Sequence, residues 1–148
     1  MYKRQQDTHS TKAAADVLAE GGNAIDAAVT AGFTMAVTLP RAGNIGGGGF
    51  MLIHDAQSNQ QTAIDYREQA SAHAERDMYL DSDGNPIKNL SEITHLAAGV
   101  PGTVRGFELA LERYGTISLA RALAPAIELA ENGFPITCLL YTSPSPRD

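Results

Sequence analysis

The sequence is poor in cysteine and in basic residues. Its single cysteine, Cys138, cannot form an intramolecular disulfide, and one thiol does not make a thiolate metal site. Eleven basic residues stand against 17 acidic ones, which gives a net charge of −6 at pH 7. An acidic surface repels phosphate groups, so this composition argues against nucleic acid or an anionic membrane as a partner.

Long apolar runs and the common catalytic patterns are also missing. The most apolar stretch, residues 24–37, has about 14 residues, whereas a membrane-spanning helix needs about 20. None of the four histidines is spaced from another as metal ligands are. Neither a Ser/His/Asp order nor a G-x-S-x-G motif occurs. The sequence therefore predicts no transmembrane segment, no metal, no cofactor and no convincing nucleophile.

The two ends do not continue the pattern of the interior. Residues 1–5 and 138–148 resemble translations of a sequencing adapter read from opposite ends, so they are not expected to be part of the fold. Without these segments, 8 basic and 16 acidic residues remain, a net charge of −8. We therefore predict a native region over residues 6–137 between two non-native segments.

The first part of the native region is predicted to form two helices. Ser10 is expected to cap a helix over residues 10–20, which a pair of glycines ends. Asn23, with Asp26 three residues later, predicts a capping box at the start of a second helix over residues 24–37. Because this second helix is apolar on nearly all sides, we expect it to be buried in a core.

Two strands and two further helices follow. Residues 50–53 and 62–66 have strand character, and the polar turn between them favours an antiparallel pair. Further helices are expected between Pro101 and Gly115, and over residues 119–132. This order of helices, strand pair, long polar loop and helices predicts an α+β fold, or part of a layered α/β/α protein.

Four consecutive glycines, residues 46–49, run directly into the first strand. Glycine-rich loops bind phosphate where a strand precedes them and a helix follows. Here a helix precedes and a strand follows, and no Gly-Lys-Ser/Thr is present. A tight helix-to-strand connection, or backbone that lines a small-molecule pocket, is therefore the favoured interpretation.

A polar stretch in the long loop partly imitates a calcium-binding loop. Asp81, Asp83 and Asn85 occupy alternating positions, and Glu92 is the twelfth residue. However, Pro86 stands where such a loop requires glycine. A solvated turn is the favoured interpretation.

Arg67 is the first candidate for a functional residue. On an extended strand, Ala63, Asp65 and Arg67 share one face. A guanidinium at a strand end, close to a glycine-rich loop, is suited to binding a carboxylate through two parallel hydrogen bonds. The alternative is an ion pair with Asp65, Glu68 or another acid. From residue types alone, this structural role is the favoured one, because such pairs are frequent.

Three blocks of sequence, in their order and spacing, resemble the γ-glutamyltranspeptidase family. They are GGNAIDAAVTAGFTMAVTLPRAGNIGGGGFMLI, AIDYRE and AAGVPGTVRGFELALERYG. The resemblance spans Thr8 to Thr137 and corresponds to the N-terminal part of the family's large subunit. It implies that residues 6–137 are a partial large-subunit domain, a fragment of an N-terminal-nucleophile hydrolase αββα sandwich.

The resemblance implies an enzyme that transfers or hydrolyses the γ-glutamyl group of glutathione and related amides. Members are made as one precursor that cleaves itself, and the nucleophile is a threonine freed at the start of the small subunit. That threonine is absent here, so the fragment alone is expected to be inactive. Its expected partners are glutathione or another γ-glutamyl donor, and the remainder of the precursor, including the small subunit. Bacterial members are commonly exported, which implies a periplasmic or extracellular location.

The resemblance also changes the interpretation of Arg67. This residue matches the family's arginine that pairs with the α-carboxylate of the donor, so substrate binding becomes its favoured role. The family often reads Arg-Glu-Met-Ala-Pro here, whereas this chain reads Arg-Glu-Gln-Ala-Ser over residues 67–71. Two alternatives stay open: a related acylase of the family, acting on cephalosporins, glutaryl amides or poly-γ-glutamate, and an inactive remnant that binds a small ligand.

Overall fold

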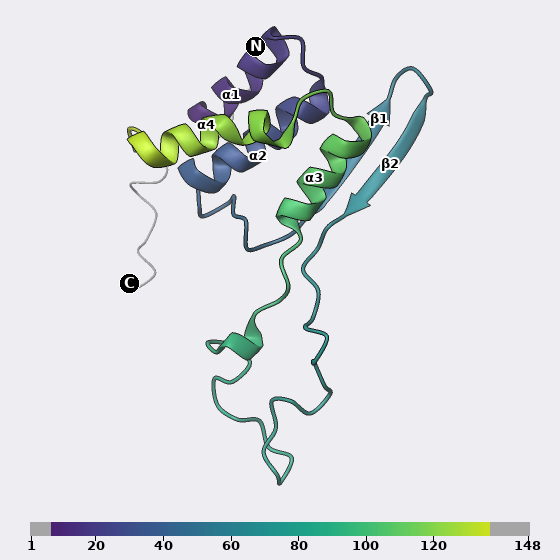
Figure 1. Ribbon diagram of the computed structural model, residues 1–148. Helices are drawn as coiled ribbons and strands as arrows, with labels where there is room; N and C mark the ends of the chain where they lie inside the picture. Colours follow the sequence, from purple (N-terminus) through teal and green to yellow (C-terminus); the bar gives the residue numbers. More distant parts are fainter. Residues whose placement is uncertain (1–6, 137–148) are drawn as a thin grey trace.

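A computed structural model describes residues 7–136 (Figure 1). The elements are α1 (Thr8–Ala19), α2 (Ala24–Thr38), β1 (Phe50–Asp55), β2 (Gln60–Asp65), the 3₁₀ helix η1 (His95–Ala97), α3 (Thr103–Tyr114) and α4 (Leu119–Asn132). Four α-helices and one antiparallel strand pair within this range confirm the α+β class. Both segments predicted to be non-native lie outside the described residues, as does Cys138.

Helix α2 lies at the centre of the helical layer. It packs against α1, α3 and α4, while α3 also lies against β2 and so joins the helices to the hairpin (Figure 1). The buried core draws on α2, α3 and α4 and on both strands: Val29, Phe33, Ile53, Ile64, Phe107, Ala110, Leu111, Ala122 and Ala126. The rings of Phe33 and Phe107 meet edge to face, with centroids 5.0 Å apart. The expected burial of the apolar second helix is confirmed.

The hairpin has one buried and one exposed face. Met51 pairs with Ile64 and Leu52 with Ala63 in the antiparallel register. Ile53 and Ile64 turn toward the helices, whereas Leu52 on the opposite face is 84% exposed. The predicted alternation along β2 is confirmed: Ile64 faces the core, and Ala63 and Asp65 face away from it.

The start of α1 differs from the prediction. Its N-cap is Asp7, and Ser10 lies inside the first turn. The Asp7 carboxylate accepts from the Ser10 backbone N–H at 2.7 Å and from Thr38 Oγ1 at 2.8 Å. A charged acceptor three residues before Ser10 therefore caps the helix, and it also ties the start of α1 to the end of α2.

The predicted capping box at α2 is confirmed, and its Asp26 also contacts a distant part of the chain. The side chain of Asp26 is fully buried. It accepts from Asn23 N at 2.8 Å, and also from Thr116 N at 2.8 Å, Thr116 Oγ1 at 2.6 Å and Ile117 N at 3.3 Å. Burial raises the pKa of Asp26, but these hydrogen bonds outweigh it and hold the pKa below its usual value. One carboxylate thus joins the start of α2 to the turn between α3 and α4.

The segment between β2 and α3 extends away from the helices as a long arm, residues 69–102 (Figure 1). Backbone bridges join Gln69 to Val100 at its base and Leu80 to Pro86 near its tip. Between them, the Tyr79 hydroxyl donates to Leu96 O at 2.9 Å. The bridge at the base holds the two ends of the arm together beside the end of β2.

None of the helices within residues 7–136 combines the length and the apolar character needed to cross a lipid bilayer.

Replacement of Asp26 is expected to destabilise the fold strongly. Asp26→Ala leaves the N–H groups of Asn23, Thr116 and Ile117 without their acceptor, and we expect a loss of about 3 kcal/mol in the free energy of unfolding. The contribution of Asp26 is complete above its unfolded pKa of about 3.9 and is lost as the pH falls through its lower folded pKa. Urea unfolding of the 148-residue chain between pH 3 and 7, followed by circular dichroism, measures both effects.

Asp16→Ala is the matched control. Asp16 is a half-exposed acid of α1 that forms an ion pair with Lys12, and its loss is expected to change stability by about 0.5 kcal/mol or less. Equal effects of the two substitutions, or an unchanged pH dependence in Asp26→Ala, would contradict the role assigned to Asp26.

Candidate functional site

The end of β2 lies between the glycine-rich loop and the start of α3. Tyr66 continues the strand pairing by one residue, donating to Gly49 O at 2.9 Å and accepting from Gly49 N at 3.3 Å. On the other side, Gly102 N and Thr103 N donate to Gly47 O at 2.9 and 3.1 Å. The glycine-rich loop, which joins α2 to β1 along the chain, is therefore hydrogen-bonded to both the end of β2 and the first turn of α3.

Two glycines allow these backbones to approach each other. A Cβ atom on Gly102 would lie 2.8 Å from the carbonyl carbon of Tyr66, and one on Gly48 would lie 2.7 Å from the backbone nitrogen of Glu68. Real Cβ atoms essentially never come so close to backbone. Residues 66–68 thus lie between two backbone segments that can come this close only because Gly48 and Gly102 have no Cβ atom.

The tyrosine before Arg67 anchors the strand end to the core. Its ring lies edge to face with Phe107, with centroids 5.8 Å apart, and covers Gly106 of α3. Burial raises the pKa of the Tyr66 hydroxyl. On an extended strand Tyr66 lies on the face opposite Arg67, and the sequence alone assigns it no role. Because the Tyr66 side chain faces the core, the side chain of the next residue, Arg67, projects outward.

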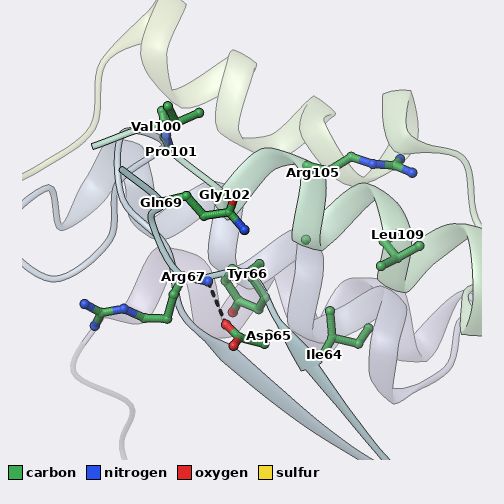
Figure 2. A pocket seen from close by; sticks show the side chains of 11 residues that line it. Ile64, Asp65, Tyr66, Arg67, Gln69, Val100, Pro101, Gly102, Arg105 and Leu109 are labelled. Carbon is green, nitrogen blue, oxygen red and sulfur yellow. Dashed lines mark hydrogen bonds between the residues drawn. The ribbon is translucent and has the colours of Figure 1, made fainter. Parts of the chain in front are cut away.

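A hollow of about 240 Å³ opens between the end of β2 and α3 (Figure 2). Its lining includes Tyr66, Arg67 and Gln69 on one side and Gly102, Arg105 and Leu109 on the other. The two arginines extend in opposite directions in Figure 2. They also differ in how their charges are compensated.

Arg67 is largely open to solvent. Its side chain is 63% exposed, and its Nε lies 3.3 Å from Oε2 of Glu68. Its backbone N–H donates to Oδ1 of Asp65 at 3.0 Å. The ion pair considered from the sequence is therefore present with Glu68, whereas Asp65 contacts the backbone. Among residues 7–136 no further hydrogen bond or ion pair engages this guanidinium, so its two Nη groups are available to a carboxylate ligand.

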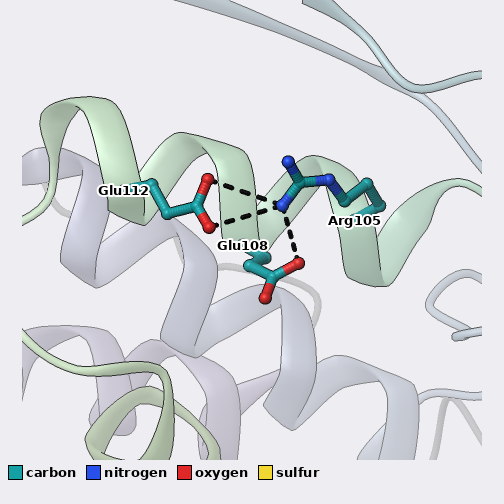
Figure 3. Close-up of polar contacts among 3 residues, drawn as sticks. All are labelled: Arg105, Glu108 and Glu112. Atoms are coloured by element: carbon teal, nitrogen blue, oxygen red, sulfur yellow. Dashed lines mark hydrogen bonds and ion pairs between the residues drawn. The ribbon is translucent and has the colours of Figure 1, made fainter.

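Arg105 has its charge compensated along α3 (Figure 3). Its Nη1 lies 2.8 Å from Glu108 and 3.4 Å from Glu112. The hydrogen bond that Arg105 donates to Glu108 and the charge of Glu112 raise the pKa of Arg105. Sequence reasoning did not single out Arg105, although its spacing from both glutamates is that of neighbours on one helix face. Of the two arginines, Arg67 is the better candidate for binding an anionic ligand.

The calcium-like stretch forms the turn that the sequence favours. Oδ1 of Asp81 accepts from the backbone N–H groups of Asp83 and Asn85, both at 2.9 Å. Gly84 in this turn has φ of +82°, in the left-handed region. Within the described part of the chain, no three His, Cys, Asp or Glu side chains gather to hold a metal ion.

Comparison with known proteins places these features in a family. A family profile described as Gamma-glutamyltranspeptidase matches residues 10–143. The glutathione hydrolase proenzyme of Escherichia coli (strain K12) is 56% identical over 128 residues, which cover 86% of this chain and 22% of the relative. The chain thus spans about a fifth of the length of this relative.

Solved structures agree with this similarity. The γ-glutamyltranspeptidase of Helicobacter pylori superimposes with a TM-score of 0.82 at 51% identity, covering 88% of this chain and 37% of that chain. The γ-glutamyltranspeptidase of Pseudomonas nitroreducens gives a TM-score of 0.84 at 45% identity, covering 95% and 42%. The four helices and the strand pair therefore have the arrangement of the corresponding part of these N-terminal-nucleophile hydrolases, which confirms the fold expected from the resemblance.

Gly102→Ala tests the close approach at the end of β2. The added methyl would overlap the backbone of Tyr66, so either α3 or the strand end has to move, and we expect a loss of about 1–3 kcal/mol in the free energy of unfolding. Urea unfolding of the 148-residue chain measures this loss. Gly46→Ala is the control, because a Cβ there meets no atom within 4 Å, and its expected effect is within about 0.5 kcal/mol. A neutral Gly102→Ala would show that the glycine is not required.

Proposed function

The chain belongs to the γ-glutamyltranspeptidase family, and we propose that it forms the donor-binding part of a glutathione hydrolase or γ-glutamyltransferase. Its substrate would be glutathione or a related γ-glutamyl amide. The complete enzyme would also need the remainder of the precursor, including the small subunit that supplies the threonine nucleophile. A periplasmic or extracellular location is part of the same proposal, because bacterial members are commonly exported.

One observation carries the proposal: the largely exposed guanidinium of Arg67 at the end of β2. Glu68 contacts the Nε edge of this group, which leaves the edge formed by the two Nη groups for a ligand. A planar guanidinium binds a carboxylate there through two parallel hydrogen bonds. The α-carboxylate of a γ-glutamyl donor is a ligand of this kind.

The role of Arg67 in the reaction is orientation. In the proposed reaction, the threonine oxygen attacks the γ-carbonyl of the donor, the bond to the amine leaving group breaks, and water or an amine acceptor then takes the glutamyl group. Arg67 holds the opposite end of the donor, which keeps the γ-carbonyl within reach of the nucleophile. No residue of this chain is proposed to form or break a bond.

A related acylase is the alternative, and the chemistry of the donor distinguishes the two. A glutaryl amide has the same carbon chain as a γ-glutamyl amide, including the terminal carboxylate, but lacks the α-amine. Arg67 can therefore bind the carboxylate of either compound, and the two donors differ only in the α-amine, which other groups of the complete enzyme would have to recognise. Because Glu108 and Glu112 compensate the charge of Arg105, Arg67 is the arginine of this hollow that fits the carboxylate.

The test is a chimera of the E. coli relative in which the 128 matching residues of this chain replace the corresponding segment. We expect the chimera to mature and to hydrolyse a γ-glutamyl anilide. Arg67→Ala should raise the KM for this donor by about 30-fold or more, because a charge-assisted bidentate contact is lost. The kcat should change much less. Steady-state kinetics with γ-glutamyl and glutaryl anilides measure both quantities.

Arg105→Ala is the matched control, since it removes an arginine that lines the same hollow. It should leave the donor KM within about twofold, because its charge is compensated by Glu108 and Glu112. An inactive chimera, or unchanged donor kinetics in Arg67→Ala, would contradict the proposed function. Higher activity of the chimera toward the glutaryl anilide would favour the acylase instead.

A further inference from the structure

The backbone changes its hydrogen-bonding partners at Arg67. Before it, Tyr66 pairs with Gly49 at the end of the hairpin. After it, Gln69 pairs with Val100 at the base of the arm, donating at 3.1 Å and accepting at 2.8 Å. In the described part of the chain the N–H of Arg67 has no carbonyl partner in either ladder, and it donates to Oδ1 of Asp65 at 3.0 Å.

We propose that Asp65 is a positioning residue for Arg67, acting as a hydrogen-bond acceptor that sets the direction in which the chain leaves β2. This inference rests on the proposed role of Arg67 in donor binding. An aspartate that accepts from the N–H two residues later closes an Asx turn, which restricts the backbone between the two residues. Here the restricted backbone is that of Tyr66 and Arg67.

Three contacts then fix Arg67 from different sides. The Tyr66 ring anchors the preceding residue to Phe107 in the core. Asp65 holds the Arg67 backbone from the exposed face of the hairpin, and Glu68 holds Nε of the side chain at 3.3 Å. Because the side chain is largely exposed, little packing would otherwise limit its direction. A fixed backbone reduces the conformational freedom that Arg67 loses when a carboxylate binds.

The turn depends on the acceptor oxygen of Asp65 and not on its negative charge. Asp65 and Arg67 lie on the same exposed face, so the charge of Asp65 works against an anionic donor. Asparagine keeps the acceptor oxygen in the same place and removes the charge. Glutamate keeps the charge but places its oxygens one methylene further away, where they no longer close the turn.

Asp55 provides a matched control within the same hairpin. Its Oδ1 accepts from the N–H of Gln57 at 2.9 Å, so it closes the same kind of turn at the opposite end of β1. Asp55 is exposed, as Asp65 is. Asp55→Ala therefore removes a turn of the same kind, together with the contact from Ser58 Oγ, without touching the backbone of Arg67.

The chimera described above, carrying each substitution, tests the inference through the donor KM and kcat. Asp65→Ala and Asp65→Glu should each raise the KM for the γ-glutamyl anilide about three- to tenfold, with kcat within about twofold, because one exposed hydrogen bond is lost. Asp65→Asn should keep the donor KM within about twofold of the parent. Asp55→Ala should leave both KM and kcat unchanged.

Three results would overturn the inference. They are a KM in Asp65→Ala equal to that in Asp55→Ala, a KM in Asp65→Asn as high as that in Asp65→Ala, and an unchanged KM in Asp65→Glu. Arg67→Ala separates this failure from failure of the proposed function. If Arg67→Ala raises the donor KM and the Asp65 variants do not, only the role of Asp65 is wrong. If Arg67→Ala has no effect, the donor-binding proposal itself fails.

Discussion

The close approach of three backbone segments at Tyr66 is the constraint on which the site depends. The glycine-rich loop, the end of β2 and the first turn of α3 meet there at distances that exclude a Cβ at Gly48 and Gly102. Hydrogen bonds from α3 to Gly47 and from Tyr66 to Gly49 hold the three together. Arg67 is the first residue beyond this junction, so the position of its backbone follows from the packing on both sides.

A second junction, at Asp26, fixes the helices that support the first. A buried carboxylate is favourable only when hydrogen bonds replace its lost hydration, and Asp26 receives them from the start of α2 and from the turn after α3. Because α3 begins at the site and ends beside Asp26, the two junctions hold opposite ends of the same helix. The stability of the helical layer and the geometry at Arg67 are therefore connected through α3.

Local patterns in the sequence predicted most of the elements, and contacts between distant segments account for what they missed. The capping box of Asn23 and Asp26 and the alternation along β2 depend on near neighbours, and both are confirmed. Asp7 was missed because Ser10 offered an equally good local cap, and the hydrogen bond from Thr38 of α2 to Asp7 joins residues 31 positions apart. The fit of Gly102 against Tyr66 joins residues 36 positions apart, so no local pattern could reveal it. The residue type and strand position make Arg67 a candidate, and its substrate-binding role stays a prediction that comes from the resemblance. Its ion-pair partner Glu68 is one of several possible acids in the sequence.

The exposed face of the hairpin favours contact between copies of this polypeptide. Within residues 7–136 the sheet has two strands, so each strand has one edge whose backbone groups have no neighbouring strand. Phe50 and Leu52 lie on the outer face, 64% and 84% exposed. Open edges beside exposed apolar side chains favour pairing between copies. The 148-residue chain is therefore expected to self-associate as its concentration rises, and its solubility depends on what covers this face.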